Sequence, residues 1–100
     1  MEVWGKEQII NQLQELNKLA IFFYTPICGT CKVAERMLVV VQELLPDLPL
    51  KKVDLNYIPD VAEKWQIQSV PCLLLFQHGE VRKRIFAFQS VEYLYKELKN

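Results

Sequence analysis

The sequence predicts an α/β fold: a central mixed sheet of about four strands with helices on both faces. Two observations carry this prediction. Segments with apolar residues at helical spacing alternate along the chain with short apolar runs that suit buried strands. The last two strand segments are separated only by a tight turn, which favours an antiparallel hairpin, whereas strand–helix–strand units require right-handed crossovers and parallel pairing. Helices on both faces of such a sheet bury all of these apolar surfaces.

The first half of the chain begins with a predicted amphipathic helix over about 6–18, because four apolar residues recur at helical spacing: Ile9, Ile10, Leu13 and Leu16. An apolar run over 19–24 predicts a strand buried on both faces, and Pro26 ends it. A long helical pattern then extends over about 28–45, with Pro46 after its end. We expect its buried face to be formed by Val33, Met37, Val41 and Leu44, with Ala34 and Leu38 alongside.

The second half continues the alternation. We expect a strand over 50–55, a short helix over about 59–65 with Pro59 in its first turn, and a continuous apolar strand over 72–76. Residues 77–80 form a turn in which Gly79 is free to take a positive φ, and residues 81–88 form the return strand. Ser90 is suited to cap a last helix, whose apolar face comprises Val91, Leu94, Tyr95 and Leu98.

Size and charge narrow the class of protein. One hundred residues suit a single domain, spanning 1–100, with one core. Twelve basic and twelve acidic side chains cancel, so there is no bulk electrostatic reason to expect nucleic acid or an anionic membrane as a partner. We interpret the basic run Arg82-Lys83-Arg84 as a solvated, charged edge of the sheet. We find neither a secretory signal nor an apolar run of about 18 residues, and we therefore expect a cytoplasmic protein.

Cys28 and Cys31 form a C-x-x-C pair at the junction of the apolar strand and the long helix. This spacing suits reversible disulfide chemistry. Amide N–H groups at a helix N-terminus and the positive end of the helix dipole favour thiolate over thiol, and the thiolate is the form that attacks disulfides. Because the cysteine count is three, with Cys72 as the remaining one, we expect a functional pair rather than a disulfide scaffold.

The chain resembles thioredoxins over nearly its whole length. The resemblance rests on Cys28-Gly29-Thr30-Cys31-Lys32 after an apolar strand, Val70-Pro71 before another strand, and His78-Gly79-Glu80-Val81 at a hairpin. It implies the thioredoxin fold and a thiol–disulfide oxidoreductase that reduces protein disulfides through a mixed disulfide. Cys28 would be the nucleophile and Cys31 the resolving thiol. The implied electron donor is a flavin-dependent thioredoxin reductase. The sulfurs carry the electrons, so we expect no bound cofactor and no metal, and we expect a monomer.

The resemblance also assigns supporting residues. Gly29 and Thr30 would tune the pair, and Thr30 stands where the family often has proline. Pro71 matches the family's cis-proline, beside which the backbone of Val70 would pair with an extended substrate chain. Ile27 replaces the tryptophan that usually precedes the first cysteine, so the substrate-docking surface that includes Ile27 and Val70 would differ from that of the family.

Other positions depart from the family pattern. Phe22 stands at the place of a buried acid that assists proton transfer from the second cysteine, so we expect slower resolution of the mixed disulfide. Lys52 matches the lysine that normally pairs with that acid, and is a possible auxiliary residue. Ala87 replaces a glycine that often flanks the active site, which would narrow the groove slightly. Cys72 replaces a common threonine. It is either a packed free cysteine or an auxiliary thiol near Cys28 that traps a glutathione-like adduct.

Three other functions compete with this interpretation. The same chemistry in the opposite direction would make a disulfide oxidase or isomerase, but the missing signal segment argues against an oxidising compartment. A redox-sensitive binding module with little turnover would dock partners through Ile27, Val70 and Pro71. A zinc or iron–sulfur site would use the three cysteines and an outside ligand. The sequence has no second C-x-x-C, and its one histidine, His78, is expected in a hairpin turn, so the metal site is the weakest of the three.

Overall fold

The computed structural model describes residues 1–99, so the last residue of the expected 1–100 domain lies outside the described residues. The described strands are β1 (Glu2–Val3), β2 (Lys18–Tyr24), β3 (Leu50–Asp54), β4 (Cys72–Gln77) and β5 (Glu80–Ile85). The described helices are α1 (Lys6–Glu15), α2 (Gly29–Leu44), the short 3-10 helix η1 (Leu55–Tyr57), α3 (Pro59–Lys64) and α4 (Val91–Leu98). The predicted α/β class with a mixed central sheet is therefore confirmed.

The strands form one sheet in the order β1-β3-β2-β4-β5. β3 pairs in parallel with both β1 and β2, whereas β4 is antiparallel to β2 and β5 is antiparallel to β4. The expected parallel pairing holds for the unit β2-α2-β3. It is wrong for β4, which returns from α3 in the direction opposite to β2 and β3. The sheet also has five strands instead of about four, because β1, with only two residues, is too short to produce an apolar pattern.

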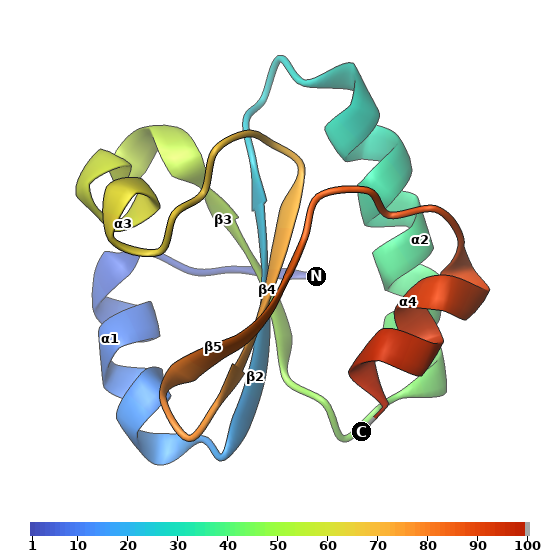
Figure 1. The fold of residues 1–100 in the computed structure, drawn as a ribbon, viewed down its shortest axis with the longest axis horizontal. Helices are drawn as coiled ribbons and strands as arrows, with labels where there is room; N and C mark the ends of the chain where they lie inside the picture. The colour runs from blue at the N-terminus through green and yellow to red at the C-terminus, as the bar shows by residue number, and fades with distance from the viewer. Residues whose placement is uncertain (100) are drawn as a thin grey trace.

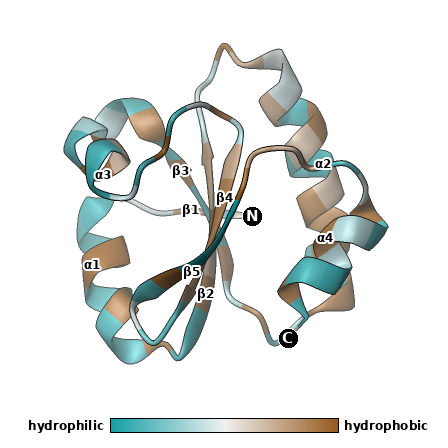
Figure 2. Cartoon of the chain, in the orientation of Figure 1, coloured by the Kyte–Doolittle hydropathy of each residue, from teal (hydrophilic) through white to brown (hydrophobic). Residues whose placement is uncertain are grey.

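Helices cover both faces of the sheet, as Figure 1 shows edge-on: α1 and α3 lie on one side, and α2 and α4 on the other. Each side has its own apolar cluster. Ile9 of α1 and Val61 of α3 belong to the first cluster, and Leu38 of α2 and Leu94 of α4 belong to the second. The central strands β2 and β4 contribute to both clusters, because successive side chains of a strand point to opposite faces. Figure 2 shows hydrophobic colour on the central strands and hydrophilic colour on the edge strand β5, with helices of mixed hydropathy on both sides of the sheet.

The buried face of α2 includes Ala34, Leu38 and Val41, as expected, but differs from the expected face elsewhere. Its buried residues are Cys31, Ala34, Leu38 and Val41. Val33 and Leu44, which we expected inside, are 50% and 53% exposed. The helix is rotated toward its smaller residues because Cys31 and Ala34 allow it to approach the sheet closely. Apolar residues occur around much of this helix, so hydrophobic periodicity alone did not identify the correct face.

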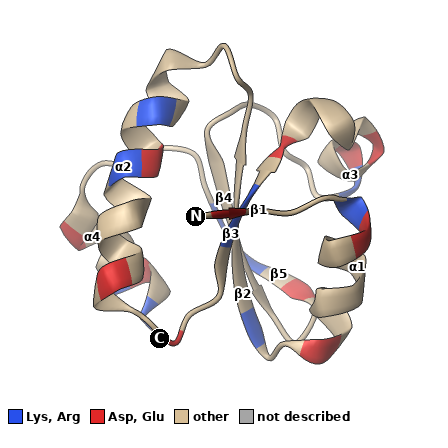
Figure 3. Ribbon diagram, turned by 180° about the vertical axis from the view of Figure 1, so that it is seen from behind, with Lys and Arg blue, Asp and Glu red and all other residues tan. Residues whose placement is uncertain are grey.

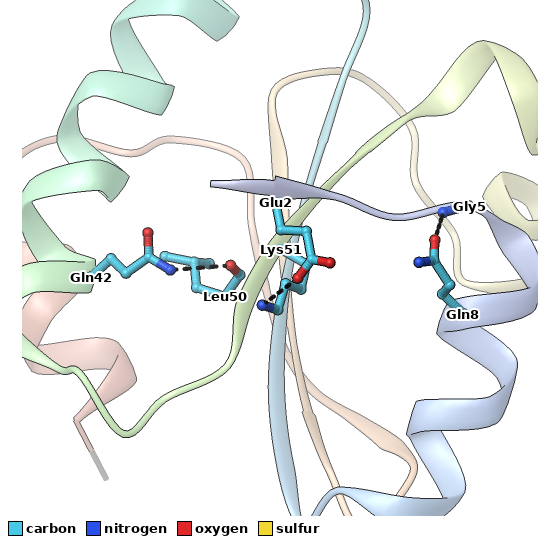
Figure 4. Close-up of polar contacts among 6 residues, drawn as sticks. All are labelled: Glu2, Gly5, Gln8, Gln42, Leu50 and Lys51. Carbon is cyan, nitrogen blue, oxygen red and sulfur yellow. Dashed lines mark hydrogen bonds and ion pairs between the residues drawn. The ribbon is translucent and has the colours of Figure 1, made fainter.

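The N-terminal segment is attached to the sheet edge by polar contacts that Figure 4 shows. The Glu2 carboxylate accepts a hydrogen bond from Lys51 Nζ over 2.9 Å, which joins β1 to β3. Gln8 Oε1 accepts from the N–H of Gly5 over 2.7 Å at the start of α1. On the other side of β3, the carbonyl of Leu50 accepts from Gln42 Nε2 over 3.4 Å. These contacts hold β3 between α2 and the N-terminal segment.

The hairpin turn and the cap of the last helix form as predicted, but the return strand is shorter than expected. Gly79 has φ +81°, in the left-handed region that glycine adopts without strain. The Ser90 hydroxyl caps α4 by accepting from the N–H of Tyr93 over 3.0 Å. β5, however, ends at Ile85 and not at Phe88, so 86–90 form an irregular connection to α4. Arg82 and Arg84 are exposed on this edge strand, as expected for a charged edge, whereas Lys83 is half-buried and donates to the carbonyl of Glu97 over 2.9 Å.

Charged residues of both signs are distributed over the helices, as Figure 3 shows from the opposite side. No helix within residues 1–99 combines the length and the apolar character that crossing a membrane requires.

Candidate active site

The loop that carries the first cysteine leaves the sheet at the carboxyl end of β2. This strand is buried along its interior and ends at Tyr24, after which Pro26 cannot continue the ladder of hydrogen bonds. The N–H of Cys28 donates to the carbonyl of Thr25 over 3.2 Å and closes a tight turn. Cys28 is then the N-cap residue of α2, with φ −93° and ψ 107°. The local sequence thus places a sulfur where most helices have a serine or aspartate oxygen.

Cys28 and Cys31 are joined by a disulfide, with Cα atoms 5.2 Å apart. Cys28 is half-buried, whereas Cys31 is only 3% exposed because it lies on the buried face of α2. The N–H of Cys31 donates to Cys28 Sγ over 3.1 Å. The first turn of α2 contains no acidic residue that would oppose a negative charge on the sulfur. The pair therefore has one accessible sulfur at a helix N-terminus and one sheltered sulfur beneath it.

The two residues between the cysteines differ in what they contribute. Thr30 Oγ1 lies 3.4 Å from Cys28 Sγ, within hydrogen-bonding distance of a sulfur. When Cys28 is a thiolate it has no proton to give, so the Thr30 hydroxyl is then the donor. At Gly29 an added Cβ would meet no atom within 4 Å, so no steric contact requires glycine there.

The loop before β4 lies at the same end of the sheet as the loop before α2 (Figure 1). It contains a cis peptide bond between Val70 and Pro71. Val70 packs against the cluster that contains Cys31, and Cys28 packs against the same cluster. Ile27 is 96% exposed directly before Cys28. The structure therefore brings the predicted docking residues to the end of the sheet where the disulfide lies.

Phe22 occupies the position at which the thioredoxin family has a buried acid. Phe22 is fully buried; its ring is stacked on Tyr24, with centroids 6.0 Å apart, and meets Phe88 edge-on at 5.8 Å. Lys52, its register partner on β3, nevertheless has a carboxylate partner. Lys52 Nζ donates to Glu35 Oε2 of α2 over 2.9 Å.

Sequence reasoning missed Glu35. Its position carried a signal, because residue 35 lies four residues after Cys31 and thus on the same side of the helix. The signal was weak, since only the fold shows that Lys52 of β3 faces this part of α2.

Cys72 lies away from the disulfide. It is fully buried, and its side chain belongs to the cluster beneath α1 and α3, whereas Cys31 belongs to the cluster beneath α2 and α4. Burial raises the pKa of the Cys72 thiol to about 12, and nearby Arg84 lowers it by less. Cys72 is therefore a packed, protonated thiol, and the structure does not bring it together with Cys28 and Cys31.

The sheet separates Cys72 from the Cys28–Cys31 pair, so the three cysteines that a metal site would need are not together. Within residues 1–99, His, Cys, Asp and Glu side chains form no group of three or more arranged to hold a metal ion.

Comparisons with known proteins agree with this geometry. The family model that matches is thioredoxin, over residues 4–100. The thioredoxin-like protein YusE of Bacillus subtilis is 49% identical over 79 residues, which cover 79% of this chain and 74% of YusE. Thioredoxin-1 of Saccharomyces cerevisiae is 36% identical over 69% of this chain and 68% of its own length. The crystal structure of oxidised mitochondrial thioredoxin 3 from the same yeast has a TM-score of 0.86 at 25% identity, covering 99% of this chain and 93% of that chain.

Proposed function

We propose that this chain, which belongs to the thioredoxin family, reduces disulfide bonds in proteins through Cys28 and Cys31. The observation that carries the proposal is the asymmetry of the pair: Cys28 is accessible at the N-terminus of α2, and Cys31 is buried one turn further on. An accessible thiolate is able to attack a substrate. The sheltered Cys31 thiol is placed to attack only Cys28 Sγ, once that sulfur is bonded to the substrate.

In the proposed reaction, the Cys28 thiolate attacks one sulfur of the substrate disulfide. A bond forms between Cys28 Sγ and that sulfur, the substrate S–S bond breaks, and the other substrate sulfur leaves as a thiolate that takes a proton from water. Cys31 then loses its proton and attacks Cys28 Sγ. The mixed disulfide breaks, the second substrate sulfur leaves, and the Cys28–Cys31 disulfide forms. Two electrons have passed from the protein to the substrate.

The proposed roles of the neighbouring residues follow from their positions. Thr30 and Gly29 set the surroundings of Cys28 Sγ, and the exposed Ile27, with Val70 and Pro71, forms the surface that holds the substrate chain. We further propose a monomer that works in the reducing cytoplasm, where a thioredoxin reductase returns the disulfide to the dithiol. Thiol titration of the oxidised protein after incubation with a thioredoxin reductase and NADPH as its electron source tests the recycling step.

Reduction of insulin disulfides, with dithiothreitol as the source of electrons, tests the function. We expect the wild type to accelerate insulin reduction and Cys28→Ser to abolish the acceleration. Cys31→Ser, reduced beforehand and incubated with insulin in the absence of dithiothreitol, should accumulate a mixed disulfide that is visible by mass spectrometry. Cys72→Ala, which changes a cysteine outside the pair, should retain activity. Acceleration that survives Cys28→Ser would contradict the proposal, and partner capture that persists with both cysteines replaced by serine would favour a binding module.

The equilibrium reduction potential of the pair against a glutathione buffer tests the direction of electron flow. A reduction potential of about −270 mV supports a reductant, whereas one of about −120 mV would support a disulfide oxidase.

A further inference from the structure

The ion pair between Lys52 and Glu35 connects the sheet to the helix that carries the cysteines. Lys52 Nζ and Glu35 Oε2 are 2.9 Å apart, and the two side chains are only 20% and 32% exposed. A salt bridge on an open surface contributes little, but one that is partly withdrawn from water is screened less and holds its members in a defined position. This pair therefore fixes a carboxylate on the second turn of α2.

Glu35 lies one helical turn after Cys31. Side chains of an α-helix lean toward its N-terminus, so the Glu35 side chain covers the turn that contains Cys31. The fold places Lys52 consistently: it is the register partner of Phe22, and Phe22 packs in the same cluster as Cys31. Lys52, and with it the Glu35 carboxylate, therefore lies on the face of the sheet that carries the cluster of Cys31.

The buried position of Cys31 creates a chemical requirement. A thiol withdrawn from water ionises reluctantly, because burial disfavours the charged form. Cys31 must nevertheless lose its proton before its sulfur attacks the mixed disulfide, and Cys31 is only 3% exposed. A general base within hydrogen-bonding reach, directly or through one water molecule, meets this requirement.

We infer that Glu35 accepts the proton of Cys31 during resolution of the mixed disulfide, a role that rests on the function proposed above. The Cys31 S–H bond breaks and its proton forms an O–H bond with the Glu35 carboxylate. The Cys31 sulfur, now a thiolate, bonds to Cys28 Sγ. The bond between Cys28 and the substrate sulfur breaks, and the substrate leaves as a thiolate. The buried Phe22 therefore does not deprive the site of a base, because the carboxylate comes from α2.

Several charged or titratable groups surround Glu35. Lys52 of β3 donates to it, and the same ammonium lies 5.4 Å from the ring centroid of Tyr24 on β2. On α2 itself, Lys32 and Arg36 line the same surface as Glu35. Among residues 1–99, no charged side chain of α4, the other helix packed on α2, forms an ion pair with Glu35. The carboxylate is therefore flanked by cationic side chains from both β3 and α2.

Ellman's reagent, 5,5′-dithiobis(2-nitrobenzoic acid), separates the two steps in one stopped-flow experiment. Its reaction with Cys28 of the reduced protein releases one thionitrobenzoate and leaves a second one bound as a mixed disulfide. Attack by Cys31 releases the second. We expect Glu35→Gln to slow the second release by about tenfold or more at neutral pH, and to move the midpoint of its pH profile upward, because general bases contribute factors of this size. The first release should be unchanged.

Three further variants test whether Glu35 acts as a general base or only as a member of an ion pair that stabilises the structure. Glu43→Gln removes the same charge from an exposed position of α2 and should leave both releases unchanged. Lys52→Met breaks the ion pair but keeps the carboxylate, so it should slow the second release less than Glu35→Gln does. Glu35→Asp keeps a carboxylate on a shorter side chain and should restore part of the rate.

A second release that is as fast in Glu35→Gln as in the wild type would overturn the inference. Equal slowing in Glu35→Gln and Lys52→Met would overturn it too, because only the ion pair would then matter. A wild type that shows no first release would contradict the proposed function instead.

Discussion

The N–H of Cys31 donates a hydrogen bond to the sulfur of Cys28 over 3.1 Å, so each cysteine contributes to the other's chemistry through the backbone as well as through the disulfide. A thiolate accepts hydrogen bonds more strongly than a disulfide sulfur, because its charge strengthens the interaction. Reduction therefore strengthens this contact at the positive end of α2. The donor in this contact is a backbone N–H, so side-chain substitutions leave it in place. The Thr30 hydroxyl, by contrast, is a side-chain group whose replacement should change the stability of the thiolate.

Replacing Thr30 by valine should make Cys28 less reactive. Valine has nearly the shape of threonine but lacks the hydroxyl that lies 3.4 Å from Cys28 Sγ. Hydrogen bonds to charged groups are worth more than neutral ones, but this contact is long and Thr30 is exposed, so we expect a loss of about two- to fivefold in the rate of alkylation by iodoacetamide at neutral pH. The measurement is the alkylation rate of the reduced protein as a function of pH.

Thr30→Ser keeps the hydroxyl and is the matched control, with a rate close to that of the wild type. The reduction potential should respond with a definite sign. Losing a donor to the thiolate destabilises the reduced form, so Thr30→Val should be the stronger reductant, by about 15 mV for a threefold change in the equilibrium constant. A potential that moves upward in Thr30→Val would show that the hydroxyl does not stabilise the thiolate.

Cys72 should be unreactive in the folded protein. Burial raises its pKa from 9.0 to about 12, and each pH unit is a factor of ten in thiolate below the pKa, so its thiolate fraction near neutral pH is about a thousandfold smaller than that of an exposed cysteine. With the Cys28–Cys31 disulfide intact, we expect iodoacetamide to modify Cys72 only after unfolding in urea. Oxidised glutathione added to Cys31→Ser should likewise form an adduct at Cys28 alone. Mass spectrometry reads both results, and an adduct at Cys72 in the native protein would contradict its placement.

The same pKa shift makes a prediction for stability at high pH. In the unfolded chain Cys72 ionises near 9.0, whereas in the folded protein it holds its proton until about 12. Above 9.0 the folded state binds more protons than the unfolded state, so the free energy of unfolding falls as pH rises, by up to about 1.4 kcal/mol per pH unit from this group. Below 9.0 the contribution of Cys72 is complete and does not change with pH.

Urea unfolding of the wild type and of Cys72→Ala, carried out in parallel between neutral and alkaline pH, isolates this contribution. Lysine and tyrosine residues titrate in the same range, but they do so in both proteins. We expect the stability advantage of the wild type over Cys72→Ala to be constant up to about pH 9 and then to shrink. An advantage that stays constant above this pH would mean that Cys72 is not buried as described.

Much of the fold could be predicted because the strongest apolar runs lie at its centre. β2 and β4 are buried on both faces and therefore read as continuous apolar segments, bounded by Pro26 and Pro71. The direction of β4 could not be predicted, because a strand's apolar content is the same whether it runs parallel or antiparallel to its neighbour. The buried face of α2 was misjudged for a related reason: Cys31 and Ala34 are small, and close packing selected them over the more hydrophobic Val33.

The cysteine pair was predictable from local spacing, whereas its surroundings depend on contacts between distant segments. The apolar strand and Pro26 directly before Cys28 already indicate that the helix starts at this cysteine. The ion pair of Glu35 with Lys52 joins residues 17 apart in the sequence, and it forms only because β3 lies next to β2 under α2. The placement of Cys72 on the opposite face likewise follows from the register of β4 against β2.

Replacing Ile27 by aspartate should impair the handling of protein substrates without affecting folding. Its side chain is 96% exposed beside Cys28, so the substitution leaves no cavity and removes no core contact. A charged group there weakens apolar docking, and it also places a negative charge next to the attacking thiolate. We expect KM for insulin to rise severalfold in Ile27→Asp and by less in Ile27→Asn, which separates the effect of the charge from the loss of apolar surface.

The first release from Ellman's reagent, a small molecule, should change little in Ile27→Asn. Equal losses with insulin and with Ellman's reagent in Ile27→Asn would show that Ile27 acts on the reactivity of Cys28 and not on the docking of proteins.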